Sequence, residues 1–341
     1  MSRFSTIFDG LYRIRIDYSE GGIGHVNVFL IQNKNDEYTM VDAGFHSTSR
    51  ELLSTIHDEL GNSIRISRLI ITHIHYDHYG GVNQVIARFS PSVMMHRREM
   101  EVINALSRAV SEEGVSWLRL LGVQDIIMDK VLKIISQERK NIPRPNQLIN
   151  EGLSIESISG IWRIIHTPGH TPGHVCLYNN DNGALISGDH LLPEETSNVP
   201  FYPIKGYNPL RDYLASLTMV KRIRPSIVIP SHGEPFSSAE SRIGELYHHH
   251  NERLRQTLEA LLSGESKITE VARQIKWSRG HFDTLSALDK WLALLETISH
   301  LEFLCWCGVV VRKIGDDIHY EVLTGDFTPV EAKLAELSTS P

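Results

Sequence analysis

The chain has 341 residues, enough for one large domain or for a large domain with a smaller one. Its apolar content of 41% and charged content of 22% are ordinary for a folded globular protein. A net charge of −7 argues against a protein that coats nucleic acid, and three cysteines are too few for a disulfide framework.

The first residues do not predict export or membrane insertion. MSRFSTIFDGLYRIRID lacks the apolar run and the small-residue cleavage site of a signal peptide. No stretch of the chain approaches the ~20 consecutive apolar residues that span a bilayer. The few cysteines favour a reducing compartment, so we expect a cytoplasmic protein.

Short strands separated by glycine- or asparagine-rich turns open the chain. Apolar and β-branched runs predict strands over residues 11–17, 25–32, 38–42, 66–71 and 93–96. A helix is predicted from Ser47 or Thr48 to about Leu60, where Gly61 would end it, and a second over residues 81–89.

Residues 97–148 interrupt this strand pattern with a predicted helical insertion. Its apolar residues include Leu106, Trp117, Leu118 and Leu121. An insertion of this length is either a lid beside a functional site or additional core, and the sequence leaves both open.

The strand pattern resumes after the insertion. Strands are predicted over residues 153–157, 162–166, 174–178, 184–187 and 226–230, and a helix over 210–223. Strands followed by helices in both halves predict an α/β layered domain over residues 1–240.

Residues 241–341 predict a second, smaller domain. Helices over about 245–263, 268–275 and 284–304 precede two strands over 309–313 and 318–323, which is the order of a winged helix. Residues 240–341 carry 11 Lys/Arg against 16 Asp/Glu, a balance of −5, whereas a DNA-binding domain is normally basic. We therefore expect this domain to pack on the α/β domain or on a second subunit, as in a homodimer.

The stretch THIHYDHYGG, residues 72–81, places four metal-capable side chains directly after a predicted strand. His73 and His75 are two residues apart, so on a strand they point to the same face. After a turn, Asp77 and His78 can point back into the same space. Imidazole and carboxylate ligands suit zinc, manganese or iron rather than calcium.

Three later motifs supply further ligand types. They are HTPGHTPGH at residues 166–174, SGDH at 187–190 and SHG at 231–233. Each follows a short apolar strand, where a layered α/β fold gathers its chemistry.

In this order, HxHxDH, TPGH, GD and a late histidine resemble the metallo-β-lactamase superfamily. Val41-Asp42-Ala43-Gly44 matches an upstream turn of that superfamily. The resemblance covers about residues 10–240 and implies a four-layer αββα sandwich. The winged-helix-like end is similar to the β-lactamase-like protein 2 subgroup, whose C-terminal module would open at His250-Asn-Glu-Arg253.

The resemblance implies a dinuclear centre like that of glyoxalase-II-type hydrolases. One metal ion would be held by His73, His75 and His170, the other by Asp77, His78 and His232, with Asp189 bridging the two. Zinc is the favoured ion, with manganese and iron(II) as alternatives. A metal-bridging hydroxide would attack the carbonyl of a thioester, ester or lactone, and an acyl thioester is favoured. Asp77 and Asp189 would steer the proton.

Two other functions remain open. Some relatives with this tail cleave single-stranded RNA, and a basic entrance could come from Arg97, Arg98, Arg139, Lys140 and Arg144. A redox or scaffold protein is the third hypothesis, against which a complete HxHxDH motif argues. For the acyl substrate, the insertion could supply an apolar channel, and a loop with Phe201, Tyr202 and Tyr207 could also line the pocket.

The remaining histidines receive structural interpretations. We expect His166, His174, His190 and Asp42 to orient ligand loops rather than to bind metal. His248-His249-His250 is interpreted as a solvated helix face, and Cys305 and Cys307 as small core residues on a strand-like face. A position beside the site stays open for His25 and Asn27.

Overall fold

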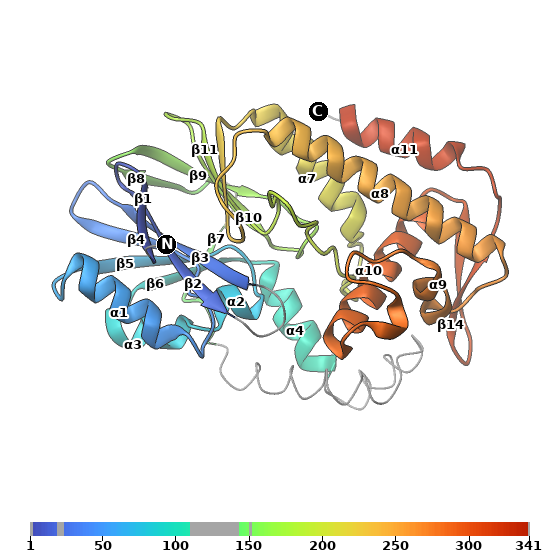
Figure 1. The fold of residues 1–341 in the computed structure, drawn as a ribbon, viewed down its shortest axis with the longest axis horizontal. Helices are drawn as coiled ribbons and strands as arrows, with labels where there is room; N and C mark the ends of the chain where they lie inside the picture. The colour runs from blue at the N-terminus through green and yellow to red at the C-terminus, as the bar shows by residue number, and fades with distance from the viewer. Residues whose placement is uncertain (1–2, 19–23, 110–142, 150–151, 340–341) are drawn as a thin grey trace. The chain divides into compact units, whose positions relative to one another are not determined.

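A computed structural model describes residues 3–18, 24–109, 143–149 and 152–339 of the chain (Figure 1). By internal contacts the chain divides into two compact units. The first contains residues 1–101, 138–197 and 223–239, and the second contains residues 102–137, 198–222 and 240–341. The division into domains at residue 240 stays a prediction.

The larger sheet of the first unit has seven strands in sequential order. β1 (Phe4–Phe8), β2 (Leu11–Tyr18), β3 (Gly24–Gln32) and β4 (Glu37–Val41) pair antiparallel. β5 (Arg65–Ile71), β6 (Ser92–His96) and β7 (Gln147–Ile149) then add in parallel. Parallel neighbours need a crossover, which α1 (Ser49–Leu60) provides between β4 and β5, and α3 (Val82–Phe89) between β5 and β6.

The smaller sheet has five strands in the order β12-β11-β10-β9-β8. These are β8 (Ser154–Ser157), β9 (Gly160–His166), β10 (Val175–Asn179), β11 (Ala184–Gly188) and β12 (Ile227–Pro230). Only β11 and β12 are parallel. Because parallel strands end at the same edge, the segments after β11 and β12 begin close together.

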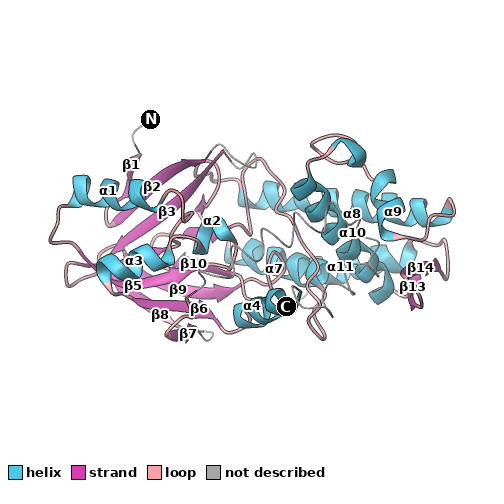
Figure 2. Ribbon diagram, turned by 90° about the horizontal axis from the view of Figure 1, so that it is seen from below, coloured by secondary structure: helices cyan, strands magenta, loops and turns pink. Residues whose placement is uncertain are grey.

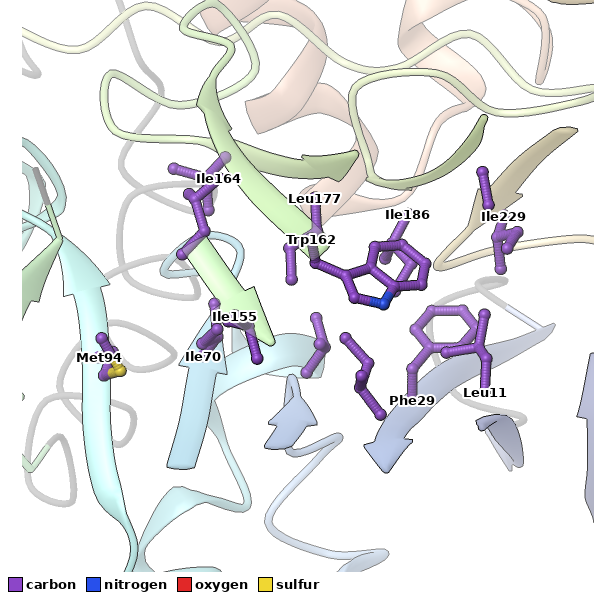
Figure 3. Packing of buried hydrophobic residues seen from close by; sticks show 14 of the residues in the cluster. Leu11, Phe29, Ile70, Met94, Ile155, Trp162, Ile164, Leu177, Ile186 and Ile229 are labelled. Atoms are coloured by element: carbon purple, nitrogen blue, oxygen red, sulfur yellow. The ribbon is translucent and has the colours of Figure 1, made fainter. Parts of the chain in front are cut away.

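The core of the first unit lies between the two sheets. Phe29 and Ile70 of the larger sheet face Trp162, Leu177 and Ile186 of the smaller one (Figure 3). All five side chains are buried. Burying a large apolar side chain stabilises the folded state by about 1.5–3 kcal/mol relative to leaving it exposed. Helices α1 and α3 pack against β2 and β5 of the larger sheet (Figure 1).

The second unit is mainly helical (Figure 2). From residue 198 on, its described elements are α7 (Pro209–Ile223), α8 (Ala239–Leu262), α9 (Ile268–Gln274), the 3₁₀ helix η2 (Phe282–Thr284), α10 (Ala287–Trp306), the hairpin β13 (Val310–Ile314) and β14 (Ile318–Val322), and α11 (Thr328–Thr339). α10 packs on α9 and β13, and α9 packs on β14. The three helices and the hairpin follow the predicted order, and their assignment as a winged helix stays an interpretation.

Most predicted elements lie within a few residues of their expected bounds, whereas β1, β7 and α11 are not among the predictions. β7 also corrects the predicted helical insertion, because its end is a strand that pairs with β6. Only the beginning of the predicted insertion is described as a helix, α4 (Glu99–Ala109). Residues 110–142, with most of its apolar residues and with Arg139 and Lys140, lie outside the described residues. None of the described helices is both long and apolar enough to cross a membrane.

Two sequence interpretations in the second unit are wrong. Cys305 and Cys307 lie at the C-terminal end of helix α10 rather than on a strand. The face of α8 at residues 248–250 is not solvated as a whole, because only His248 is exposed and His250 is fully buried. Adjacent helical residues point about 100° apart, so one of three neighbours readily faces the core.

Candidate metal centre

The HxHxDH loop leaves β5 and turns into the short helix α2 (Tyr76–Tyr79). His75 is the extended residue before this helix, and Asp77 and His78 lie within it. Gly80 and Gly81 have ordinary negative φ values, so their role is not to supply left-handed backbone. A Cβ on Gly80 would collide with the carbonyl oxygen of Tyr76, and one on Gly81 with that of Ala43. The two glycines therefore permit close packing.

Asp42 anchors this loop from the end of β4. Its carboxylate accepts the backbone N–H of Thr72 at 2.8 Å and the Thr72 hydroxyl at 2.8 and 3.0 Å. Oδ2 also lies 2.8 Å from Nδ1 of His78. Asp42 has a φ of +63°, and its bonds offset the cost of that left-handed conformation. The sequence expectation that Asp42 orients a ligand loop agrees with these contacts.

The first histidine set consists of His73, His75 and His170. Nε2 of His170 lies 3.1 Å from Nε2 of His73 and 2.9 Å from Nδ1 of His75. Oδ2 of Asp189 lies 3.9 Å from Nε2 of His73 and 3.7 Å from Nε2 of His170. The four ligand-type atoms converge on one small volume.

The second set consists of Asp77, His78 and His232. Oδ2 of Asp77 lies 3.1 Å from Nε2 of His232 and 3.5 Å from Nε2 of His78. Oδ1 of Asp189 lies 3.4 Å from each of these nitrogen atoms. Asp189 thus directs Oδ2 to the first set and Oδ1 to the second.

These separations fit divalent metal ions. Around a tetrahedral zinc ion, with bonds of about 2.0–2.1 Å, ligand atoms lie about 3.3 Å apart. Most of the measured separations lie close to that value. The donors are five imidazoles and two carboxylates, a set that suits zinc, manganese or iron. Either set could hold an ion.

The outward nitrogen atoms of the histidines are fixed by neighbours. Besides the His78–Asp42 contact, Nδ1 of His73 lies 3.1 Å from the Thr72 hydroxyl, and Nδ1 of His170 lies 3.0 Å from the Ser197 hydroxyl. Nδ1 of His232 donates to the backbone carbonyl of His25 at 2.6 Å. Such contacts orient Nε2 toward the site, as is usual for metal-ligating histidines.

The electrostatics of the two sets differ. Burial and then the neighbouring histidines lower the pKa of His75 to about 3 and that of His73 well below its usual value. Burial alone would also lower the pKa of His232, but Asp189 and Asp77 raise it to about 10. Burial acts against ionisation of Asp189, yet His232 and His78 hold the pKa of its carboxyl well below its usual range. The second set is therefore the more strongly charged one.

Glu99, at the start of α4, joins two of the ligand loops. It accepts the backbone N–H of Ile74 at 2.8 Å, between His73 and His75. It also accepts the N–H of Gly173 at 2.6 Å and the hydroxyl of Thr171 at 2.7 Å, close to His170. Burial raises the pKa of Glu99 to about 7, against the effect of these three donors.

His166 and His174 behave as the sequence suggested, and Asn27, which the sequence left open, also contacts a ligand loop. Nε2 of His166 donates to the Pro172 carbonyl at 2.9 Å, and Nε2 of His174 accepts the backbone N–H of Asp189 at 3.2 Å. Asn27 donates to the carbonyls of Pro230 and Gly233 at 3.0 and 2.9 Å, which holds the loop of His232. These side chains position ligand loops.

The structure thus brings all seven predicted ligands together from four loops. Sequence reasoning missed Glu99, Thr72, Ser197 and the carbonyl of His25. Thr72 precedes the motif directly and could have been found as a neighbour, but nothing in the local sequence distinguishes Glu99 or Ser197 from other polar residues. Phe201, Tyr202 and Tyr207 are buried in the second unit, and their place in a pocket stays a prediction.

Comparison with known proteins agrees with this geometry. The sequence model of the metallo-beta-lactamase superfamily matches residues 21–232. The probable metallo-hydrolase YqjP of Bacillus subtilis is 26% identical over 83% of this chain and 88% of its own length. The human acyl-coenzyme A thioesterase MBLAC2 is 25% identical over 67% of this chain and 80% of its own length.

Among solved structures, a beta-lactamase domain protein from Burkholderia ambifaria has a TM-score of 0.80 with 26% identity. The match covers 94% of each chain. The predicted α/β fold is confirmed by this likeness.

Proposed function

Because the chain belongs to the metallo-beta-lactamase superfamily, we propose that it is a dinuclear metal-dependent hydrolase that acts on acyl thioesters. Metal-dependent hydrolysis follows from the family and from the relatives. The thioester substrate and the ligand roles are our own proposal. The observation that carries the proposal is the placement of Asp189, which presents one carboxylate oxygen to each of two ligand sets.

Two divalent ions bound at these sets would acidify a water molecule and polarise a substrate carbonyl. The chain's own residues set up that chemistry. Asp189 would hold the two sets at a fixed separation through its two oxygens. Oδ2 of Asp77 lies between His78 and His232 and would be its ligand atom, so Oδ1 is the oxygen left to accept the proton of the attacking water. The contacts of His78 and His232 with Asp42 and His25 keep these rings from turning.

The ease with which the leaving group departs without being protonated favours a thioester as the substrate. The ionisable side chains of both sets are all assigned as ligands, so a leaving group that departs as an anion is preferred. A thiol with a pKa of about 8.5 leaves as its thiolate far more readily than an alcohol does. The similarity to an acyl-coenzyme A thioesterase supports the same choice.

The proposal has further parts that agree with the sequence. The ions are zinc by preference, the substrate is a small acyl compound rather than nucleic acid, and the enzyme works in the cytoplasm, with a homodimer as the proposed assembly. The chain's net charge of −7 argues against a protein that coats nucleic acid.

The test is a substrate panel with the metal-loaded full chain. It contains acyl-coenzyme A esters of increasing length, S-lactoylglutathione, an acyl-homoserine lactone and a single-stranded RNA. Each substrate is incubated with wild type, with wild type plus chelator, and with Asp189→Asn. We expect thioester hydrolysis by the metal-loaded wild type alone. Cleavage of RNA without any thioester turnover would contradict the proposal and favour the ribonuclease.

A further inference from the structure

A second group of metal-capable side chains lies in the helical unit. His249 and His250 come from α8, and Glu296 comes from α10. One ligand-type atom from each lies within 4.8 Å of the other two. His250 is fully buried and Glu296 is 7% exposed, so this is not a chance gathering of surface charges.

A chain of hydrogen bonds determines which nitrogen of His250 carries its proton. Nδ1 of His300 lies 2.8 Å from the backbone carbonyl of Glu296. A carbonyl can only accept, so Nδ1 of His300 carries the hydrogen. In a neutral ring Nε2 of His300 is then a bare acceptor.

This assignment passes on to His250. Nε2 of His300 lies 3.2 Å from Nδ1 of His250, so Nδ1 of His250 must donate. In a neutral ring, Nε2 of His250 then keeps an unprotonated lone pair. Metal-ligating histidines have this arrangement, with one nitrogen donating to a fixed partner and the other facing the ion.

Within the described residues, the lone pair on Nε2 of His250 accepts no hydrogen bond. Nε2 of His250 and Nε2 of His249 are both buried without a hydrogen-bond partner there. Leaving a buried polar atom unsatisfied costs about 1–3 kcal/mol, so two in one cluster need an explanation. The two rings are 5.1 Å apart, edge to face.

Glu296 retains capacity for an ion. Its Oε2 accepts from Asn198 at 2.7 Å and its Oε1 from Arg253 at 3.2 Å. Each oxygen of a carboxylate has two lone pairs, so one remains on each. Arg253 offsets the negative charge of Glu296, so the expected affinity for a metal ion is lower than that of a site with unpaired carboxylates. The guanidinium of Arg253 also stacks on Trp277.

We propose that His249, His250 and Glu296 bind one transition-metal ion of the zinc class, which ties α8 to α10. Two imidazoles and one carboxylate suit zinc, nickel, copper or iron, and not calcium or magnesium. All three residues belong to the second unit, so this inference does not depend on the proposed hydrolase activity. Its role is structural, because the ion would join two helices inside that unit.

The test counts bound zinc in the full-length chain. Wild type, His249→Gln and Glu296→Gln are emptied with chelator, dialysed to equilibrium against buffered Zn²⁺ and analysed by mass spectrometry for metal per chain. His248→Gln is the matched control, because His248 is the exposed neighbour on the same helix. Circular dichroism establishes that each variant is folded, and His249→Gln is the least disruptive variant because its ring is only partly buried.

We expect His249→Gln and Glu296→Gln to bind one ion fewer per chain than wild type, with His248→Gln unchanged. The unfolding temperature of wild type should rise further with Zn²⁺ than that of His249→Gln. The test compares the zinc content of the variants with that of wild type. Ions bound by the ligand sets of the first unit therefore cancel in the comparison. Equal zinc content in wild type and His249→Gln would overturn the proposal, and so would an equal loss in His248→Gln.

Discussion

The first unit, a sandwich of two sheets, and the second, helical unit each bury a cluster of histidines. The two units build these clusters in opposite ways. In the sandwich, ligand types stand on loops that leave strands, several of them within six residues of one another, from His73 to His78. In the helical unit, His249 and His250 meet Glu296 only because two long helices pack together. Local loops leave a motif in the sequence, whereas facing helices leave none.

The two clusters also differ in charge. In the sandwich, Asp77 and Asp189 are neighboured by histidines, which can lose their protons when metal binds. In the helical unit, Glu296 is paired with Arg253, whose charge is permanent. The first arrangement suits two tightly held dications and the second suits one weaker ion.

The largest expected effect is at Asp189, which contacts both ligand sets. Asp189→Asn should lower kcat/KM for thioester hydrolysis by about a thousandfold or more, because the metal ions supply several kcal/mol to the transition state. Initial rates with matched metal loading measure this. The control is Asp58→Asn, an exposed carboxylate on α1. Retention of more than a tenth of wild-type activity would remove Asp189 from its central role.

At Asp42 we expect a smaller effect that added metal reverses. Asp42→Asn removes the charge that orients His78 and should weaken metal binding by about 10–100-fold. A titration of apo-protein with Zn²⁺, read by activity, measures the shift. Asp36→Asn is a matched control, because Asp36 is an exposed aspartate with a similar φ of +58°. An activity loss that excess zinc does not restore would contradict a positioning role.

At Glu99 the expected effect is on folding. Glu99→Ala leaves the donors on Ile74, Thr171 and Gly173 without their acceptor. Each unsatisfied buried donor costs about 1–3 kcal/mol, so we expect the free energy of unfolding to fall by about 3 kcal/mol or more. Urea denaturation measures it, with Glu101→Ala, an exposed neighbour, as control. Equal stability of the two variants would show that Glu99 does not hold the loops.

The smallest expected effect is a difference in the rate of chemical modification between the thiols of the two units. Burial raises the pKa of Cys176, in the sandwich, and of Cys305 and Cys307, in the helical unit, to about 12. Only Cys176 is completely buried. At pH 8, iodoacetamide should therefore modify Cys305 and Cys307 slowly and Cys176 hardly at all, as peptide mass spectrometry would reveal. Modification of Cys176 at the rate seen in urea would show that the sandwich opens easily.

The sequence could predict those features that short stretches encode. The strand before His73, the glycines after His78 and the strand before His170 each follow from a few neighbouring residues, and all seven predicted ligands come together. Glu99 could not be predicted, because its partners lie 25 and more residues away and its own surroundings are ordinary for a helix start. His250 was misread as exposed because the buried face of α8 depends on α10.

Two metal ions held by these ligand sets are expected to drive thioester hydrolysis. The direct measurement is the initial rate of acyl-coenzyme A hydrolysis by apo-protein as Zn²⁺ is added, carried out on His249→Gln so that the helical cluster does not take up ions. We predict a rate that rises until two ions are bound per chain and then levels off. A rate independent of zinc, or complete with no more than one ion, would contradict the dinuclear hydrolase.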